Sequence, residues 1–342
     1  MFWPVLARLF GESLDWLQVE VTSHCNAACA YCPRTVYRQV WQSRHLSLDL
    51  FRRLLPDLPR IRLLHLQGWG EPFLNPDFLT MLSLAKAAGC RVGTTTNGML
   101  LDADMMASII DGGLDMIAFS LAGTGEDNDR IRRGTRFAQV MEAVKSIDEL
   151  KARKGVDLPQ VHIAYMLLRS GLAELRRLPQ VLKGLGVSQV VVSTLDFVAA
   201  PELIPESLRF MAPEERLEVA AMLTDLAEQG RGLGLPFHFN FPPSGRPVAA
   251  CPENAGRAAC VAADGAVTPC VFLNLPVQNA ACCSLAGAVP YQRMTCGFLA
   301  DDSLLKIWRS SACRGFRRSL SQGPLPLPCR HCLKLATPPS QP

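Results

Sequence analysis

Short stretches of aliphatic and β-branched residues alternate with longer stretches of helical spacing over the first two-thirds of the chain. Compact apolar runs predict buried strands, and apolar residues three and four positions apart predict helices that cover them. The predicted strands are residues 17–21, 61–66, 91–95, 116–120, 161–167 and 189–195. The predicted helices between them are residues 48–58, 76–88, 103–111, 137–154 and 172–185, and glycines follow several of these as stop signals.

Six repeats of strand and helix predict an α/β fold. Strands joined by helices form a parallel sheet with right-handed crossovers, so the repeats indicate a partial (βα)6 barrel of the TIM type. The chain after Phe197 does not supply the two further units that a complete barrel needs. In such a barrel we expect functional side chains at the carboxyl ends of the strands.

The pattern changes beyond residue 197. Several prolines between residues 201 and 243 indicate a linker, which carries one predicted helix at residues 213–229. Further on, Asp264-Gly265 lies between apolar runs and predicts a β-hairpin. We therefore expect a barrel core of residues 1–200, a helical linker of residues 201–245 and a small cysteine-rich extension of residues 246–342.

Composition and charge narrow the class of protein. The chain has 342 residues, of which 49% are apolar, enough to bury one large or two modest cores. Its net charge of +4 is small and we expect it to be unclustered, which argues against a nucleic-acid surface. No apolar run reaches the roughly 20 residues that cross a bilayer, and residues 1–8 are too short for a secretory signal. We expect a cytoplasmic protein without a membrane partner, whose thirteen cysteines are kept reduced for metal.

Three cysteines follow the first predicted strand with the spacing C-x3-C-x2-C. Cys25, Cys29 and Cys32 can offer three thiolates from one tight loop, with the aromatic Tyr31 just before the last. Such a set suits a [4Fe–4S] cluster and leaves its fourth iron without a protein ligand. A structural zinc ion would need a fourth ligand, and His24 is wrongly spaced for the usual paired zinc ligands.

With this loop the chain resembles the radical SAM superfamily, whose cysteine motif has the same form. The resemblance implies a partial barrel and S-adenosyl-L-methionine chelated to the open iron. It also implies that Gly68-Trp69-Gly70-Glu71, at the end of the second strand, binds the methionine amino group, although Trp69 replaces the usual second glycine. Glycines allow close backbone approach and a carboxylate can accept from an ammonium group, so Gly68, Gly70 and Glu71 are candidate cofactor-binding residues.

Polar residues at the next strand ends resemble further elements of the same superfamily. Asn97 lies in Thr-Asn-Gly and Ser120 in Ser-Leu-Ala-Gly, where Ala122 replaces a common acidic residue. Residues of these types also build turns and helix caps. The resemblance implies that Asn97, Ser120 and Tyr31 line the cofactor site and that Arg132 contacts its carboxylate, with Arg130 or Arg133 as alternatives.

The cysteines near the end of the chain resemble the C-terminal extension called SPASM or, in its shorter form, twitch. No cysteine follows Cys332, so the short form with one auxiliary [4Fe–4S] cluster is implied. The implied ligands are Cys251, Cys270, Cys329 and Cys332. Cys260 is a reserve ligand that is otherwise expected to be a small buried residue. A zinc site remains the alternative, and no role is assigned to Cys282, Cys283, Cys296 and Cys313.

The resemblance implies an enzyme that reductively cleaves S-adenosylmethionine and abstracts a hydrogen atom with the 5′-deoxyadenosyl radical. It also implies a low-potential electron donor of the flavodoxin or ferredoxin type. We expect a peptide substrate, with a small metabolite dehydrogenase or a non-catalytic iron–sulfur electron-transfer protein as alternatives. In sulfatase-maturing members of the superfamily, an aspartate that follows the corresponding cysteine serves as the base for dehydrogenation. Here Val271 follows Cys270, which weighs against dehydrogenation with such a base. Arg169 and Asp196, at strand ends, are the substrate-facing candidates, although surface ion pairs would explain them equally well.

Overall fold

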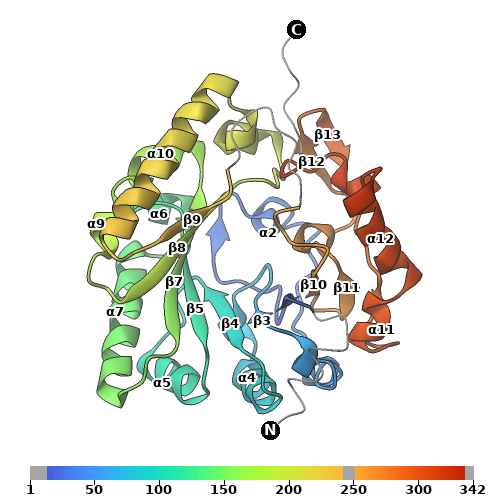
Figure 1. Cartoon of the computed structure of the whole chain (residues 1–342), viewed down its shortest axis with the longest axis horizontal. Helices are drawn as coiled ribbons and strands as arrows, with labels where there is room; N and C mark the ends of the chain where they lie inside the picture. Colours follow the sequence, from blue (N-terminus) through green and yellow to red (C-terminus); the bar gives the residue numbers. More distant parts are fainter. Residues whose placement is uncertain (1–13, 242–250, 336–342) are drawn as a thin grey trace.

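A ten-stranded sheet organises the computed structural model, which describes residues 14–241 and 251–335 (Figure 1). Its strand order is β14-β11-β10-β1-β3-β4-β5-β7-β8-β9. The six predicted strands are confirmed and run parallel to their neighbours. They are β1 (Trp16–Val19), β3 (Leu64–Leu66), β4 (Val92–Thr96), β5 (Met116–Leu121), β7 (Gln160–Leu167) and β8 (Val187–Thr194).

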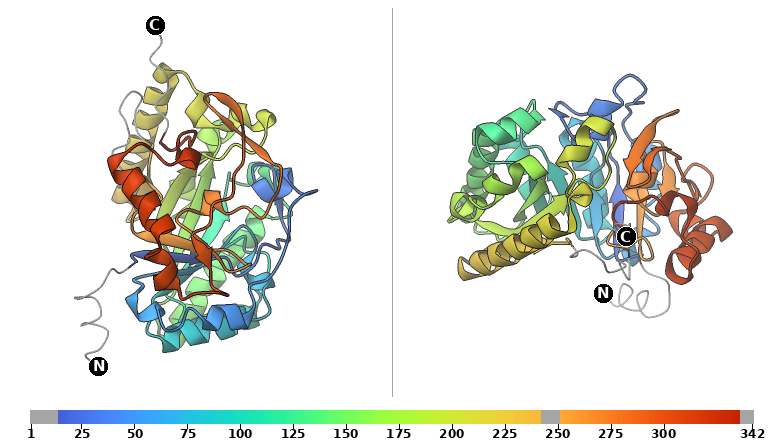
Figure 2. Two further views of the ribbon diagram at one scale, coloured as in Figure 1. Left: turned by 90° about the vertical axis from the view of Figure 1, so that its right-hand side faces the viewer. Right: turned by 90° about the horizontal axis from the view of Figure 1, so that it is seen from above.

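Helices cover the outer side of these strands, as Figure 2 shows from above. The predicted bounds are confirmed for α5 (Ala103–Asp111) and α7 (Phe137–Lys154), and α4 (Phe78–Ala87) is slightly shorter than predicted. The helix expected at residues 48–58 ends early as α3 (Leu48–Arg52), since Pro56 has no N–H for the carbonyl of Arg52. The helix expected at residues 172–185 is two short ones, α8 (Leu172–Leu175) and α9 (Leu178–Leu182), with Pro179 in the first turn of the second.

The sheet extends beyond the six predicted strands at both edges. After α10 (Pro213–Gly232), the short strand β9 (Phe237–Phe239) lies parallel to β8, within the range expected to be a linker. This strand is a seventh parallel strand that the sequence analysis did not predict, although it does not supply the two further strand–helix units of a complete barrel. On the other side, β10 (Ala258–Val261) lies parallel to β1, with Trp16 opposite Ala258.

The C-terminal extension begins at that second edge. β10 and β11 (Ala266–Thr268) form the hairpin predicted at Asp264-Gly265, where Gly265 has a φ of +82° that suits glycine. β14 (Gly297–Phe298) pairs with β11, and a separate hairpin is made by β12 (Ala281–Ser284) and β13 (Gly287–Pro290). Two helices, α11 (Leu304–Trp308) and α12 (Ser311–Gln322), lie at the periphery of the extension (Figure 1).

The core lies between the sheet and its helices. Apolar strand residues such as Leu17, Leu64 and Ile117 are fully buried, as is Phe51 of α3. Such burial contributes about 1.5–3 kcal/mol for each large side chain. Within the described ranges, no helix is long and apolar enough to cross a membrane.

Candidate active site and auxiliary cluster site

The loops at the carboxyl ends of the parallel strands enclose a cavity of about 200 Å³. The structure brings together here all ten residues that the sequence assigned to the first cluster and its cofactor. They are Cys25, Cys29, Cys32, Tyr31, Gly68, Gly70, Glu71, Asn97, Ser120 and Arg132. These residues come from loops up to 107 positions apart in the chain, so the parallel fold alone places them together.

Local contacts hold the cysteine loop over this cavity. Its short strand β2 (Ala28–Cys29) pairs with β6 (Arg132–Arg133), which follows α6 (Glu126–Ile131). Cys32 then occupies the N-cap position of α2 (Pro33–Val36), without a capping hydrogen bond from its side chain. Burial raises the pKa of the Cys25 thiol and raises that of Cys32 to about 12. Thiols in this environment remain protonated unless a bound cation stabilises the thiolates, which iron does.

Arg132 has an unused donor inside the cavity wall. Its guanidinium donates a hydrogen bond to the Tyr31 hydroxyl, and its Nε is buried without a hydrogen-bond partner among the described residues. A buried unpaired guanidinium N–H is costly. A carboxylate-bearing ligand would satisfy it, so the residues present fit the methionine carboxylate of S-adenosylmethionine.

Glu71 fastens the glycine-rich loop to the neighbouring strand. Its two carboxylate oxygens accept hydrogen bonds from Thr96 Oγ1 and from the backbone N–H of Asn97, each at 2.7 Å. Burial raises the pKa of Glu71 to about 7, although these hydrogen bonds act in the opposite direction. The ammonium group of a bound S-adenosylmethionine would therefore share carboxylate oxygens that already accept hydrogen bonds from Thr96 and Asn97. The clearest role of Glu71 is to position the glycine-rich loop.

Glu20, which the sequence analysis missed, connects the barrel to the extension. Its buried carboxylate accepts from the backbone N–H of Trp69 at 2.9 Å and from that of Ala263, in the hairpin turn, at 3.1 Å. A Cβ on Gly68 would lie 2.2 Å from Glu20 Cγ, so this glycine is needed for packing. Glu20 stands between two valines at the end of an apolar strand, a position where a carboxylate needs a partner if it is buried.

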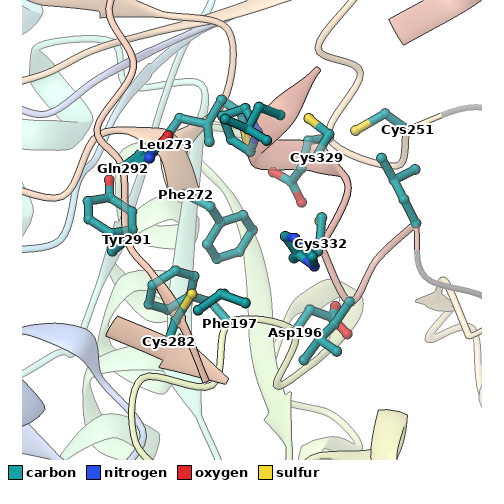
Figure 3. Close-up of a pocket in the computed structure, with 18 of the residues that line it drawn as sticks. Asp196, Phe197, Cys251, Phe272, Leu273, Cys282, Tyr291, Gln292, Cys329 and Cys332 are labelled. Atoms are coloured by element: carbon teal, nitrogen blue, oxygen red, sulfur yellow. The ribbon is translucent and has the colours of Figure 1, made fainter. Parts of the chain in front are cut away.

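A second cavity, of about 230 Å³, lies within the extension (Figure 3). Cys251, Cys270, Cys329 and Cys332 all line it, as expected for a shared cluster. In the described ranges, no three His, Cys, Asp or Glu side chains converge on a position for one metal ion. Thiols spread around a cavity suit a [4Fe–4S] cube, in which each thiolate binds a different iron.

Cys260, the reserve ligand, does not line this second cavity. It lies on β10 and faces a small cavity of about 10 Å³ beside Gln18 and Glu20. Burial raises its pKa well above the ordinary value of a thiol. The geometry therefore groups Cys270, and not Cys260, with the other three thiols.

Four further cysteines had no predicted role. Cys282 and Cys283 of β12 also line the second cavity, and the Cys282 side chain is visible there in Figure 3. The backbone N–H of Cys283 donates to Val198 O at 2.8 Å. Cys296 and Cys313 lie apart from these, with their thiols in hydrogen-bond contact, and this contact raises the pKa of Cys296.

Three side chains line both cavities: Asp196, Phe197 and Phe272. The two phenylalanine rings stack with centroids 5.9 Å apart. The Asp196 carboxylate accepts from Arg209 Nε at 2.6 Å and lies 3.7 Å from Lys334 Nζ. Asp196 thus occupies the boundary between the two sites.

Arg169, the other substrate-facing candidate, lies elsewhere. Its exposed guanidinium pairs with Glu215 of α10, and it lines neither of the two cavities. Arg169 therefore forms a surface ion pair, which was the alternative to a substrate-facing role.

The chain forms a partial barrel with one thiol-lined cavity at the carboxyl ends of its strands and a second in the C-terminal extension. This arrangement is that of an iron–sulfur protein built on a barrel. Comparison with known families makes this specific: the model of the radical SAM superfamily matches residues 19–169, and that of the SPASM iron–sulfur cluster-binding domain matches residues 251–333. The chain belongs to the radical SAM superfamily, is an enzyme of that superfamily and carries a SPASM-type extension.

The relatives of this chain carry different functional names. The chain is 26% identical over 266 residues to the tungsten-containing aldehyde ferredoxin oxidoreductase cofactor-modifying protein of Pyrococcus furiosus, a match that covers 75% of this chain and 71% of the relative. It is 28% identical over 177 residues to the mycofactocin maturase MftC of Mycobacterium tuberculosis, covering 50% of this chain but only 43% of that protein. Among solved structures, SuiB of Streptococcus suis bound to S-adenosylmethionine has a TM-score of 0.68 at 14% identity, over 97% of this chain and 74% of SuiB, which shows a shared fold.

Proposed function

We propose that this enzyme uses S-adenosylmethionine at the Cys25, Cys29 and Cys32 site to modify a peptide held between its two cavities. The observation that carries the proposal is the shared wall of Asp196, Phe197 and Phe272, which lets one substrate contact both sites. The relationship to a mycofactocin maturase supports a peptide substrate.

Residues of the first cavity have separate roles in this proposal. Cys25, Cys29 and Cys32 would hold a [4Fe–4S] cluster, and the unused Nε of Arg132 would donate to the carboxylate of S-adenosylmethionine. When bound, the cluster and S-adenosylmethionine supply hydrogen-atom abstraction by a carbon-centred radical, chemistry that belongs to the cofactor. Asn97 and Ser120 line the same cavity, where they would help to hold the cofactor in place.

Aromatic side chains exclude water from the space where the substrate reacts. The Trp69 ring lies 6.0 Å from that of Phe272, which in turn stacks on Phe197. Such shielding keeps the radical from reacting with groups other than the substrate. Asp196 is the polar group in this wall, and its carboxylate accepts a hydrogen bond from Arg209 Nε.

We propose that Cys251, Cys270, Cys329 and Cys332 bind the auxiliary [4Fe–4S] cluster and that a low-potential flavodoxin or ferredoxin supplies electrons. All four thiols line one cavity, and three of them, Cys251, Cys270 and Cys329, pack around the apolar residues Ala255, Leu273 and Phe316. Apolar surroundings around a cluster tune its reduction potential. A small-molecule substrate is the second candidate, because the Pyrococcus furiosus relative is a cofactor-modifying protein.

Anaerobic reconstitution tests the proposal. The wild-type protein should bind about eight irons, four per cluster, and form 5′-deoxyadenosine with dithionite and S-adenosylmethionine. Cys25→Ala should abolish 5′-deoxyadenosine formation, whereas Cys90→Ala, at a buried thiol outside both cavities, should not. Equal product formation by wild type and Cys25→Ala would contradict the enzyme site.

The substrate class is tested with peptides encoded by short reading frames beside the gene. A peptide substrate should lose one hydrogen atom to the 5′-deoxyadenosyl radical. Deuterium placed in the peptide should therefore appear in 5′-deoxyadenosine. Deuterium transfer from a small metabolite, and from none of the peptides, would favour the second candidate.

A further inference from the structure

The net positive charge of this chain arises in its last forty residues. Residues 303–342 contain seven Lys or Arg and no Asp or Glu, while residues 1–302 contain the other 28 basic and all 31 acidic residues. The net charge is therefore +7 in the C-terminal stretch and −3 in the rest. The expectation of an unclustered charge is wrong, because a small total conceals two opposite parts.

Part of this charge faces solvent on the outer side of the extension. Arg314 and Arg318 of α12 and Arg330 in the following loop are exposed, and together we call them the C-terminal basic face. By contrast, Lys334 points inward and pairs with Glu253 and Asp196. Arg317 lies against Trp308, 3.9 Å from the ring centre.

The same segment forms the wall of the auxiliary cavity. Phe316 and Leu320 of α12 line the cavity from the inner side of the helix, and Cys329 and Cys332 follow in the loop. Leu327 lines the cavity too, yet 54% of its surface is exposed to solvent. At Leu327, therefore, one side chain both lines the cavity and reaches solvent.

We propose that the C-terminal basic face, with the exposed Leu327, is the docking surface for a small acidic electron-carrier protein that exchanges one electron with the auxiliary cluster. The carrier is oxidised by one electron and the cluster is reduced by one, and no bond is formed or broken. The proposal rests on the cluster assignment proposed above.

Physical arguments favour this partner. Electron-transfer complexes use small interfaces, for which a few exposed side chains suffice. Opposite charges on the two surfaces steer the encounter and raise the association rate by about 10- to 1,000-fold. An acidic carrier complements the exposed Arg314, Arg318 and Arg330, and the exposed Leu327, which lines the cavity, gives it an approach to Cys329 and Cys332.

The test compares two triple variants with the same change of charge. R314E/R318E/R330E reverses the basic face. R153E/R176E/K183E reverses three exposed residues near α7, α8 and α9, on the opposite side of the molecule from α12 (Figure 1). The probe is flavodoxin, used oxidised for binding titrations and as the hydroquinone for stopped-flow reduction of the reconstituted enzyme.

We expect the basic-face variant to bind flavodoxin at least about tenfold more weakly at low ionic strength and to be reduced at least about tenfold more slowly. The difference should shrink at high salt, where the Debye length falls to about 3 Å at 1 M. The control variant should behave as wild type. The milder R314Q/R318Q/R330Q variant should lie between them, and dithionite should reduce all four proteins equally.

Two results would overturn the proposal. Binding and reduction of the basic-face variant at wild-type rates would show that flavodoxin docks elsewhere. Retained flavodoxin binding together with lost binding of an oligo-glutamate peptide would assign the face to an acidic peptide. A wild type that fails to form an auxiliary cluster at all, seen as four irons and not eight, would instead overturn the proposed cluster site on which this inference rests.

Discussion

Replacing Glu20 by alanine should loosen the connection between the glycine-rich loop and the hairpin of the extension. The change removes the acceptor of two backbone N–H groups, those of Trp69 and Ala263, both within 3.1 Å of the carboxylate. Each buried donor left unpaired costs about 1–3 kcal/mol. Burial also raises the pKa of Glu20, so part of this loss is offset by relief of the buried charge. We therefore expect local destabilisation of about 2–4 kcal/mol.

Hydrogen exchange of the reconstituted enzyme, measured anaerobically by mass spectrometry, checks this value. Since 1.4 kcal/mol corresponds to a factor of ten, amide exchange around Trp69 and Ala263 should accelerate by about 30- to 1,000-fold. Glu20→Gln keeps one acceptor and should give a smaller acceleration at both segments. Glu218→Ala, at an exposed position of α10, is the control. Unchanged exchange at both segments in Glu20→Ala would refute the role assigned to this carboxylate.

Three further predictions follow from the geometry. Cys270→Ala should lose about four irons and retain cleavage of S-adenosylmethionine, whereas Cys260→Ala should keep all of its iron; the reverse result in an iron assay would make Cys260 the ligand. Gly68→Ala places a Cβ 2.2 Å from Glu20 Cγ and should lower the rate of 5′-deoxyadenosine formation, and a normal rate would show that the loop can move. Cys282→Ser should keep its full iron content, because four thiols already serve four irons; a loss of iron would make Cys282 a ligand.

Regular patterns made much of the barrel predictable. The bounds of α5 and α7 follow from apolar periodicity and from glycines at their C-termini, and the six strands follow from compact apolar runs. The first cavity was also predictable, because a parallel fold gathers the carboxyl ends of strands at one place. The sequence motifs at the strand ends and the parallel fold thus indicate the same site.

Features that depend on partners distant in the sequence were not predictable. Strand β9 has three residues, Phe237–Phe239, too few for a periodic signal, and it is fixed by pairing with β8. Cys260 and Cys270 stand on the two sides of one hairpin, and which of them reaches the cavity depends on how that hairpin packs beside β1. The role of Glu20 likewise needs Trp69 and Ala263, which lie 49 and 243 positions away.

The parallel pairing of β10 with β1 makes the extension difficult to exchange for another. The strand that leads into the Cys25 loop has the extension as its neighbour, with Leu17 opposite Ala259 and Val19 opposite Val261. A truncation before residue 251 would leave the N–H and C=O groups of β1 without partners along that edge, where a second chain could add and aggregate. A chimaera that exchanges extensions between relatives should therefore carry β1 and the Cys25 loop from the same parent as β10.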